Sequence, residues 1–245
     1  MKLIILFLFI WSCSTSSPDQ MFGKTLGKEE TFQLTDRNGS YLVKREVKFN
    51  QGRLISRLRY FDKDGVTQLE NTVAVSRVGS LKKQGSLAVL PEASQFKVWF
   101  EKEEFASQTK VLPKKKKVAV NLESPNPLWK GIKEFDLPKA RYVCYFSQLP
   151  ECLKLQKLLI QSARKPVTLY ILWDNFPYQT ELYSNVEGTI VSFATLTANA
   201  QVKDEFKFNL DIGSQILFFH YDRNLNFTKM FWVAQGISMI KLGLK

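Results

Sequence analysis

The sequence has few of the residues on which most enzyme and metal sites depend. It contains one histidine, His220, and three cysteines among 245 residues. A metal site needs more His and Cys ligands than this, so no metal is expected. The chain also lacks a phosphate-binding loop and the Gly-x-Ser-x-Gly, His-Glu-x-x-His and Cys-x-x-Cys motifs. We therefore expect no cofactor and no enzymatic activity.

His220 is the one residue that invites a catalytic interpretation. It stands in the segment FFHYD, two positions before Asp222. A His–Asp pair is part of a catalytic triad, but a triad also needs a Ser or Cys nucleophile, and no sequence feature nominates one. We interpret His220 as a strand histidine on a polar face, and an enzyme that uses it is the least favoured hypothesis.

The N-terminus has no apolar run long enough to cross a membrane. Leu3 to Trp11 is a run of nine apolar residues, whereas a spanning helix needs about 20. Lys2 precedes the run, and the small residue Ser12 follows it, directly before Cys13. A short apolar run between a positive charge and a small residue is typical of a signal peptide.

Residues 1–13 resemble the signal of a bacterial lipoprotein, in which the cysteine after the apolar run is lipidated and becomes the mature N-terminus. The resemblance implies a signal peptide over 1–12, a lipid anchor (including palmitate) on Cys13, and a flexible tether over 13–30, which is rich in Ser, Thr, Pro and Gly. By resemblance to the enterobacterial sorting rule, Ser14 in place of Asp implies the outer membrane, facing the periplasm. The alternative is an ordinary secretory signal that is cleaved elsewhere.

The charge balance is strongly basic, with a formal net charge of +12. In a cell envelope this charge either meets anionic lipid head groups and acidic polysaccharides or only keeps the protein soluble. The basic residues are dispersed along the chain, which favours the interpretation that the charge only keeps the protein soluble. The run PKKKK at 113–117 is either an anionic-surface patch or a solvated hairpin tip, and we favour the tip. Nucleic acid is not expected as a partner of an exported chain.

Most of the chain has the pattern of β-strands. Apolar and polar residues alternate in many segments, and Asn/Asp-Gly turns separate the first strands, which predicts antiparallel hairpins. In one strand, 40–50, the alternation runs through Tyr41, Val43, Arg45, Val47 and Phe49. The predicted strands occupy 31–35, 40–50, 53–62, 66–78, 86–90, two within 96–112, 117–123, 141–146, 167–174, 178–186, 188–200, 205–212, 215–222, 227–234 and 236–244.

Two segments interrupt the β pattern. The Pro-rich segment 124–139 predicts a boundary between an N-terminal β-rich part (31–123) and a C-terminal one (135–245), although a single domain over 31–245 is an alternative. We expect Trp129 and Ile132 within it to pack onto a sheet. Leucines at helical spacing after Pro150 predict one short helix at about 149–162.

If Cys13 is lipidated, Cys144 and Cys152 are the two cysteines that remain, an even number that can pair with each other. Such pairs usually oxidise outside the cytoplasm. Cys144 would leave a strand and Cys152 would lie on the first turn of the helix, so their separation of eight positions allows a disulfide.

The segment from Arg141 to the end resembles a bacterial envelope family of unknown function, on its pattern of strands and turns such as FFHYDRNLNFTKMFW. That family is similar to the lipoprotein-carrier half-barrels, in which a curved antiparallel sheet wraps a helix and binds acyl chains. The resemblance implies a mainly β fold, either a curved antiparallel sheet or a barrel-like meander. With 32 Phe, Tyr and Trp residues in the chain, such a sheet is either packed or hollow enough to hold an apolar ligand.

Two function hypotheses follow. The first is a lipid-anchored, non-enzymatic envelope module that binds a lipid or other apolar ligand inside the sheet. The second is a structural or interaction lipoprotein whose basic surface contacts another envelope component. An interior cavity of several hundred Å³ would favour the first hypothesis, and a packed interior the second. The sequence leaves the oligomeric state open.

Overall fold

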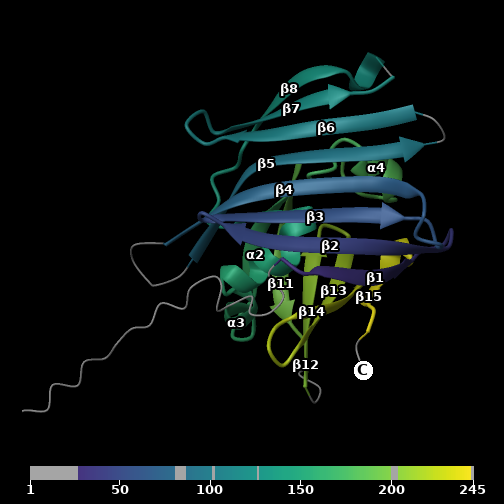
Figure 1. Cartoon of the computed structure of the whole chain (residues 1–245). Helices are drawn as coiled ribbons and strands as arrows, with labels where there is room; N and C mark the ends of the chain where they lie inside the picture. Colours follow the sequence, from purple (N-terminus) through teal and green to yellow (C-terminus); the bar gives the residue numbers. More distant parts are fainter. Residues whose placement is uncertain (1–26, 81–86, 101–102, 126, 200–203, 244–245) are drawn as a thin grey trace, which may run out of the picture.

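Fifteen strands form one curved sheet in the computed structural model, which describes residues 27–80, 87–100, 103–125, 127–199 and 204–243 (Figure 1). The strand order is β8-β7-β6-β5-β4-β3-β2-β1-β15-β14-β13-β12-β11-β10-β9. All neighbours are antiparallel except β9 and β10, which are parallel. The sheet does not close, and β8 and β9 are its edges. The prediction of a mainly β fold with a curved antiparallel sheet is confirmed.

The first eight strands form a meander of hairpins. The β2–β3 turn shows why the chain reverses where it does: Asn50 pairs with Arg53, and the two residues between them, Gln51 and Gly52, both have positive φ (49° and 74°). Tight two-residue hairpins require this backbone conformation. The strands are β1 (Glu29–Thr35), β2 (Ser40–Asn50), β3 (Arg53–Phe61), β4 (Gln68–Ser80), β5 (Leu87–Phe100), β6 (Glu103–Leu112), β7 (Lys117–Glu123) and, after the 3₁₀ turn η2 (Pro127–Trp129), β8 (Gly131–Asp136).

The remaining strands continue the same sheet on the other side of β1. The last strand returns to pair with the first, with Phe32 opposite Lys241 and Thr35 opposite Ser238. This pairing joins both halves of the chain into one sheet. The strands are β9 (Val143–Tyr145), β10 (Val167–Leu172), β11 (Val191–Ala198), β12 (Glu205–Ile212), β13 (Gln215–Asp222), β14 (Phe227–Trp232) and, after the 3₁₀ turn η4 (Val233–Gln235), β15 (Ile237–Lys241).

The predicted helix at 149–162 is present, but it is interrupted. A 3₁₀ turn, η3 (Phe146–Gln148), leads into α2 (Leu149–Leu155), and α3 (Leu158–Ser162) follows. Pro150 lies at the first turn of α2, as expected. Lys157 has a left-handed backbone (φ 55°), which ends the first helix and turns the chain before the second.

Several local expectations were wrong. The strand expected at 86–90 and the first one within 96–112 are a single strand, β5, and the Pro-rich segment 124–139 contains the strand β8. The segment 178–186 is no strand, because Tyr178 and Leu182, four positions apart, pack together on one side of the short helix α4 (Gln179–Leu182) against Phe96 and its neighbours. Ile132 is 75% exposed, since it lies on the edge strand β8. Trp129 does pack as expected, with its ring centroid 4.9 Å from that of Tyr178.

The helical segment lies in the concavity of the sheet. Figure 1 shows β1–β8 in front, with β11–β14 running across them at a steep angle behind and α2 and α4 also behind. α2 contacts β5, and α3 contacts β10 and β11. One continuous apolar core contains residues from both halves. No helix in the part of the chain that the structure describes is long and apolar enough to cross a membrane.

Gln148 fastens this segment to the sheet. It is fully buried, and its Nε2 donates hydrogen bonds to the backbone carbonyls of Ala74 (2.8 Å) and Leu54 (3.3 Å). Its Oε1 accepts a hydrogen bond from the hydroxyl of Ser76 (2.5 Å). A buried amide with three such bonds sets the position of η3 and α2 against β3 and β4.

Candidate functional site

A cavity of about 480 Å³ lies between the helical segment and the concave face of the sheet. Its volume falls within the range of about 300–1,000 Å³ that is typical of small-molecule sites. Both halves of the chain contribute to its wall, which is mostly apolar and aromatic. Apolar wall residues include Leu34, Leu58, Val98, Phe219, Met230 and Met239.

Stacked aromatic rings form one part of the wall. Phe146 of η3 lines the cavity and stacks on the fully buried Trp173, which is not part of the wall, with ring centroids 4.6 Å apart. Tyr183 and Trp232 both line the cavity and form a tilted pair with ring centroids 4.6 Å apart. Trp232 is held in place because its Nε1 donates a hydrogen bond to Gln215 Oε1 (2.9 Å). Aromatic pairs at these separations are favourable contacts, so this part of the wall is rigid.

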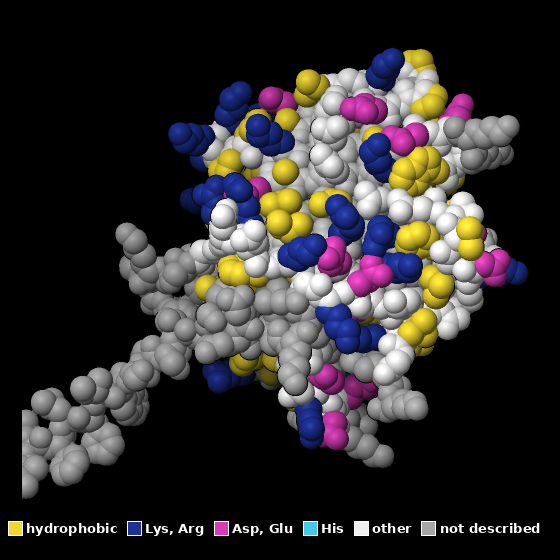
Figure 2. Space-filling model, in the orientation of Figure 1, with side chains coloured by type: hydrophobic (Ala, Val, Ile, Leu, Met, Phe, Trp, Pro, Cys, Tyr) yellow, Lys and Arg dark blue, Asp and Glu magenta, His cyan; other side chains and the backbone are white. Residues whose placement is uncertain are grey.

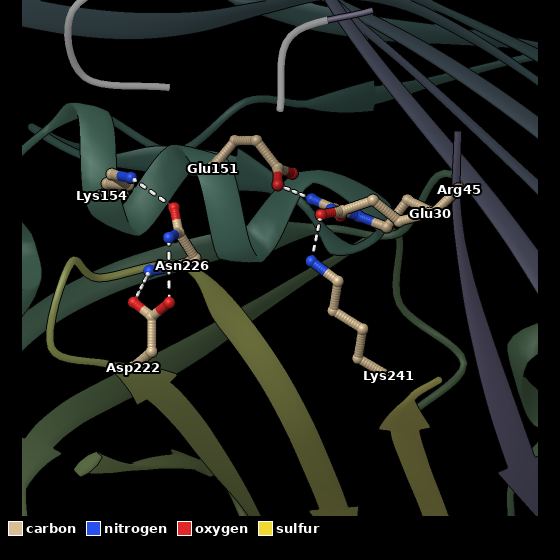
Figure 3. Close-up of polar contacts among 7 residues, drawn as sticks. All are labelled: Glu30, Arg45, Glu151, Lys154, Asp222, Asn226 and Lys241. Carbon is tan, nitrogen blue, oxygen red and sulfur yellow. Dashed lines mark hydrogen bonds and ion pairs between the residues drawn. The ribbon is translucent and has the colours of Figure 1, made fainter. Parts of the chain in front are cut away.

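A buried charge cluster lies where β1, β2, β15 and α2 meet (Figure 3). Arg45, which also lines the cavity, forms an ion pair with Glu151 of α2 and a second one, 2.9 Å long, with Glu30 of β1. Lys241 of β15 contacts the other oxygen of Glu30 at 2.5 Å. Burial lowers the pKa of Arg45, and the charge of Glu30 opposes this effect. The guanidinium charge is therefore compensated by two carboxylates inside the protein.

Figure 3 also shows a neighbouring set of contacts at the β13–β14 turn. Lys154 of α2 contacts Asn226 Oδ1 at 3.4 Å. Asn226 in turn donates from its backbone and from its side chain to the carboxylate of Asp222. These bonds tie the outer side of α2 to the C-terminal half.

For a second polar group in the cavity wall, the part of the chain that the structure describes supplies no cationic partner. Glu70 of β4 and Asp174, two residues after β10, line the cavity with Tyr60 and Tyr183 close to both. Asp174 accepts hydrogen bonds from Ser147, at 3.2 Å from its backbone nitrogen and also from its hydroxyl. Burial raises the pKa of Glu70 to about 8 and that of Asp174 to about 6, and the charge of Asp174 adds to the rise at Glu70. We call the two carboxylic acids Glu70 and Asp174 the acidic patch.

The structure brings the predicted cysteine pair together. Cys144 of β9 and Cys152 of α2 are both fully buried, and their Cα atoms are 6.0 Å apart, which is a disulfide-compatible distance. Gln156 Nε2 points at both sulfurs, at 3.0 Å from Cys152 and 3.5 Å from Cys144. Cys13 lies outside the described residues.

His220 and Asp222 have different partners. His220 Nδ1 lies 3.3 Å from Glu205 of the neighbouring strand, and burial lowers the pKa of the imidazole. Asp222 accepts hydrogen bonds from the residues of its own turn, including the backbone nitrogen of Asn224 (2.8 Å). The structure therefore does not form the His–Asp pair of a triad. Among the described residues, no group of three or more His, Cys, Asp and Glu side chains is placed to hold a metal ion.

The basic side chains are spread over the outside of the sheet. Figure 2 shows Lys and Arg distributed among acidic, polar and apolar side chains over the face of β1–β8. Lys114 to Lys116 lie exposed in the β6–β7 turn, which is a hairpin tip as the sequence predicted.

Sequence reasoning overlooked the charged residues of the cavity, although a signal for them existed. Arg45 occupies an inward position in the alternation of β2, between Val43 and Val47. Glu70 stands in the same phase as the buried residues Thr72 and Ala74 of β4. A charged residue in the inward phase of a strand is uncommon, because burial of a charge is costly.

Comparisons of the chain with known protein families, with curated proteins and with solved structures found no match.

Proposed function

We propose that this protein binds a lipid or other apolar ligand in the cavity between its sheet and its helical segment, without chemical conversion of the ligand. One observation carries the proposal: a cavity of about 480 Å³ whose wall is mostly apolar and aromatic. A protein whose only task is structural gains nothing from such a volume, because unfilled apolar space costs stability. The proposed setting is the cell envelope, with the protein held at the outer membrane, facing the periplasm, by a lipid on Cys13.

The wall residues suit a flexible apolar chain. Met230 and Met239 are unbranched and polarisable, so they adapt to irregular ligands. Phe146, Tyr183 and Trp232 add flat apolar surfaces to the same wall. An apolar chain that fills this space would exclude water from the wall, and about 25 cal/mol per Å² of buried apolar surface would favour binding.

The test is to fill the cavity. Full-chain protein is titrated with the neutral fluorescent probe N-phenyl-1-naphthylamine and with 1-dodecanol as its competitor. We expect Met230→Trp, which places a larger side chain in the cavity, to weaken both ligands at least tenfold. Ile216→Trp on β13, where Ile216 is 43% exposed, is the matched control and should bind like the wild type.

The outcome distinguishes the two hypotheses. No saturable binding to the wild type, or equal binding by both variants, would reject a cavity ligand. The second candidate, a structural lipoprotein that contacts another envelope component through its basic surface, would then be favoured by the Lys and Arg residues of Figure 2. Circular dichroism of each variant checks that it is folded.

A further inference from the structure

The charges of the cavity wall differ in sign from those of the whole protein. The chain carries a net charge of +12. Its cavity is nevertheless lined by four carboxylic acids, Asp36, Glu70, Asp174 and Glu181, and by a single basic residue, Arg45. A ligand in the cavity therefore meets a local field that the overall charge does not reveal.

The one basic residue is not free to neutralise a ligand. Arg45 is 4% exposed and is already paired with Glu30 and Glu151. Lys241 balances the second charge of this cluster through Glu30. A carboxylate or phosphate head group would have to displace one of these buried partners, which would leave that partner unpaired at a high energetic cost.

The acidic patch has the opposite property, because it lacks a positive partner. Among the described residues, neither Glu70 nor Asp174 forms an ion pair. The groups that face them are Tyr60 from β3, Thr72 from β4, Tyr145 from β9, Ser147 from η3 and Tyr183 from the loop after α4. None of these groups is a cation, and buried carboxylates without a cation resist ionisation, as the raised pKa values of both residues indicate.

A further acceptor adjoins the patch. Asn175 follows Asp174 directly, lines the same cavity and is 4% exposed. Its Oδ1 is buried and has no hydrogen-bond partner among the described residues. Buried acceptors usually have a donor, so this oxygen is a second, independent indication that an N–H donor is missing from the wall.

We propose that the ligand is an amphiphile with a protonated amine as its head group, held by Glu70, Asp174 and Asn175 while its apolar chain lies against the aromatic and methionine wall. This inference rests on the proposed apolar-ligand function and names the class of ligand. An ammonium group supplies three N–H donors and one positive charge, which are the two things that the patch lacks. Its charge also favours ionised Glu70, so binding near neutral pH releases a proton from this residue and strengthens as the pH rises toward 8.

The test compares three ligands of equal chain length. The full chain is titrated calorimetrically with dodecylamine, 1-dodecanol and dodecanoate, each below its micelle concentration. At pH 8 we expect dodecylamine to bind at least tenfold tighter than dodecanol, and dodecanoate to bind most weakly. At pH 5.5, where Glu70 is protonated, the advantage of the amine should shrink several-fold. Non-specific attraction to a protein of charge +12 predicts the reverse order.

Variants separate this inference from the proposed function. Glu70→Gln should remove most of the preference for dodecylamine over dodecanol, measured as the ratio of the two affinities, while the exposed Glu187→Gln should keep the wild-type ratio. Asp174→Asn provides a second variant if Glu70→Gln does not fold. If dodecanol binds and dodecylamine binds no tighter, the amine inference is wrong and the apolar-ligand function stands. If none of the three ligands binds, the proposed function itself is rejected.

Discussion

At the scale of single residues, the cysteine pair and the acidic patch illustrate two ways in which burial changes side-chain chemistry. Cys144 and Cys152 are buried next to each other, where two thiols have little access to other partners. Glu70 lies near Asp174 in the cavity wall, where two charges are unfavourable together. The carboxylate pair depends on contacts between distant segments, whereas the cysteines are only eight positions apart, and each pair leads to a measurable property.

We predict a disulfide between Cys144 and Cys152 in the protein under oxidising conditions. The bond joins β9 to α2, and by the loop-entropy argument its removal should cost ~2–3 kcal/mol. Cys144→Ser should therefore lower the melting temperature and leave one thiol at Cys152. Alkylation and mass spectrometry without reductant provide the measurement. Two reactive thiols at these positions in the unreduced native protein would contradict the prediction.

The free energy of unfolding should decrease as the pH rises, because of Glu70. Its pKa of about 8 in the folded state exceeds the ordinary value of 4.5, so the folded state holds a proton that the unfolded state has already lost. The free energy of unfolding should therefore decrease between pH 4.5 and pH 8, by roughly 2–4 kcal/mol from this group. Asp174 adds a smaller decrease between pH 3.8 and pH 6.

Denaturant unfolding at pH 5 and at pH 8 tests this expectation. Glu70→Gln should be close to the wild type at pH 5 and more stable than the wild type at pH 8. The exposed Glu187→Gln should follow the wild type at both values. An equal pH dependence in wild type and Glu70→Gln would show that Glu70 does not hold its proton.

At the scale of elements, the charge cluster fastens α2 to the strands at the junction of both halves. Arg45 of β2 is paired with Glu151 of α2 and with Glu30 of β1, and Lys241 of β15 completes the cluster (Figure 3). These contacts connect elements that are far apart in the chain. They also explain why a charged residue occupies the inward phase of β2.

Removing the charge of Arg45 alone should lower the free energy of unfolding more than removing the charges of Arg45 and Glu151 together. Arg45→Met leaves the buried Glu151 without its cation, so we expect a loss of about 3–5 kcal/mol in the free energy of unfolding. The double variant Arg45→Met, Glu151→Leu removes both charges and should recover a large part of this loss. Urea denaturation of wild type, both single variants and the double variant measures the coupling. Additive losses would mean that the pair contributes no coupling.

At the scale of the whole molecule, the position of the cavity follows from how the open, curved sheet lies around the helical segment. Strand β15 pairs with β1, so both ends of the described chain lie in the middle of the sheet. The strands on either side of this junction supply opposite parts of the cavity wall, such as Leu58 and Met230. The proposed anchor at Cys13 would precede β1 by 16 positions in the sequence.

We predict acylation of Cys13. Cells that express the full chain and grow with a labelled fatty acid should label the wild type, and Cys13→Ser should remain unlabelled and move to the soluble fraction. Several acyl chains are sufficient for stable anchoring, since each buried methylene adds ~0.8 kcal/mol. Membrane fractionation should find the label in the outer membrane. An unlabelled wild type would reject the lipoprotein interpretation.

The sequence by itself determined those features that depend on neighbours along the chain. Alternation and Gly-containing turns were sufficient for the hairpins such as β2–β3, because a two-residue turn such as Gln51-Gly52 sets its own register. Pro150 and the leucine spacing were sufficient for α2, and the spacing of Cys144 and Cys152 was sufficient to bring them together.

Only the tertiary structure decided those features that depend on contacts between distant segments. The pairing of β15 with β1, the helical turn at Tyr178 and the exposure of Ile132 follow from packing and sheet order, which alternation alone does not encode. The cavity is another such feature. The sequence pattern of inward-facing residues is the same whether their side chains contact other side chains or line a cavity. Glu70 and Asp174 are 104 positions apart, and their chemistry arises because the fold brings them together in the cavity wall, where no described cation pairs with them.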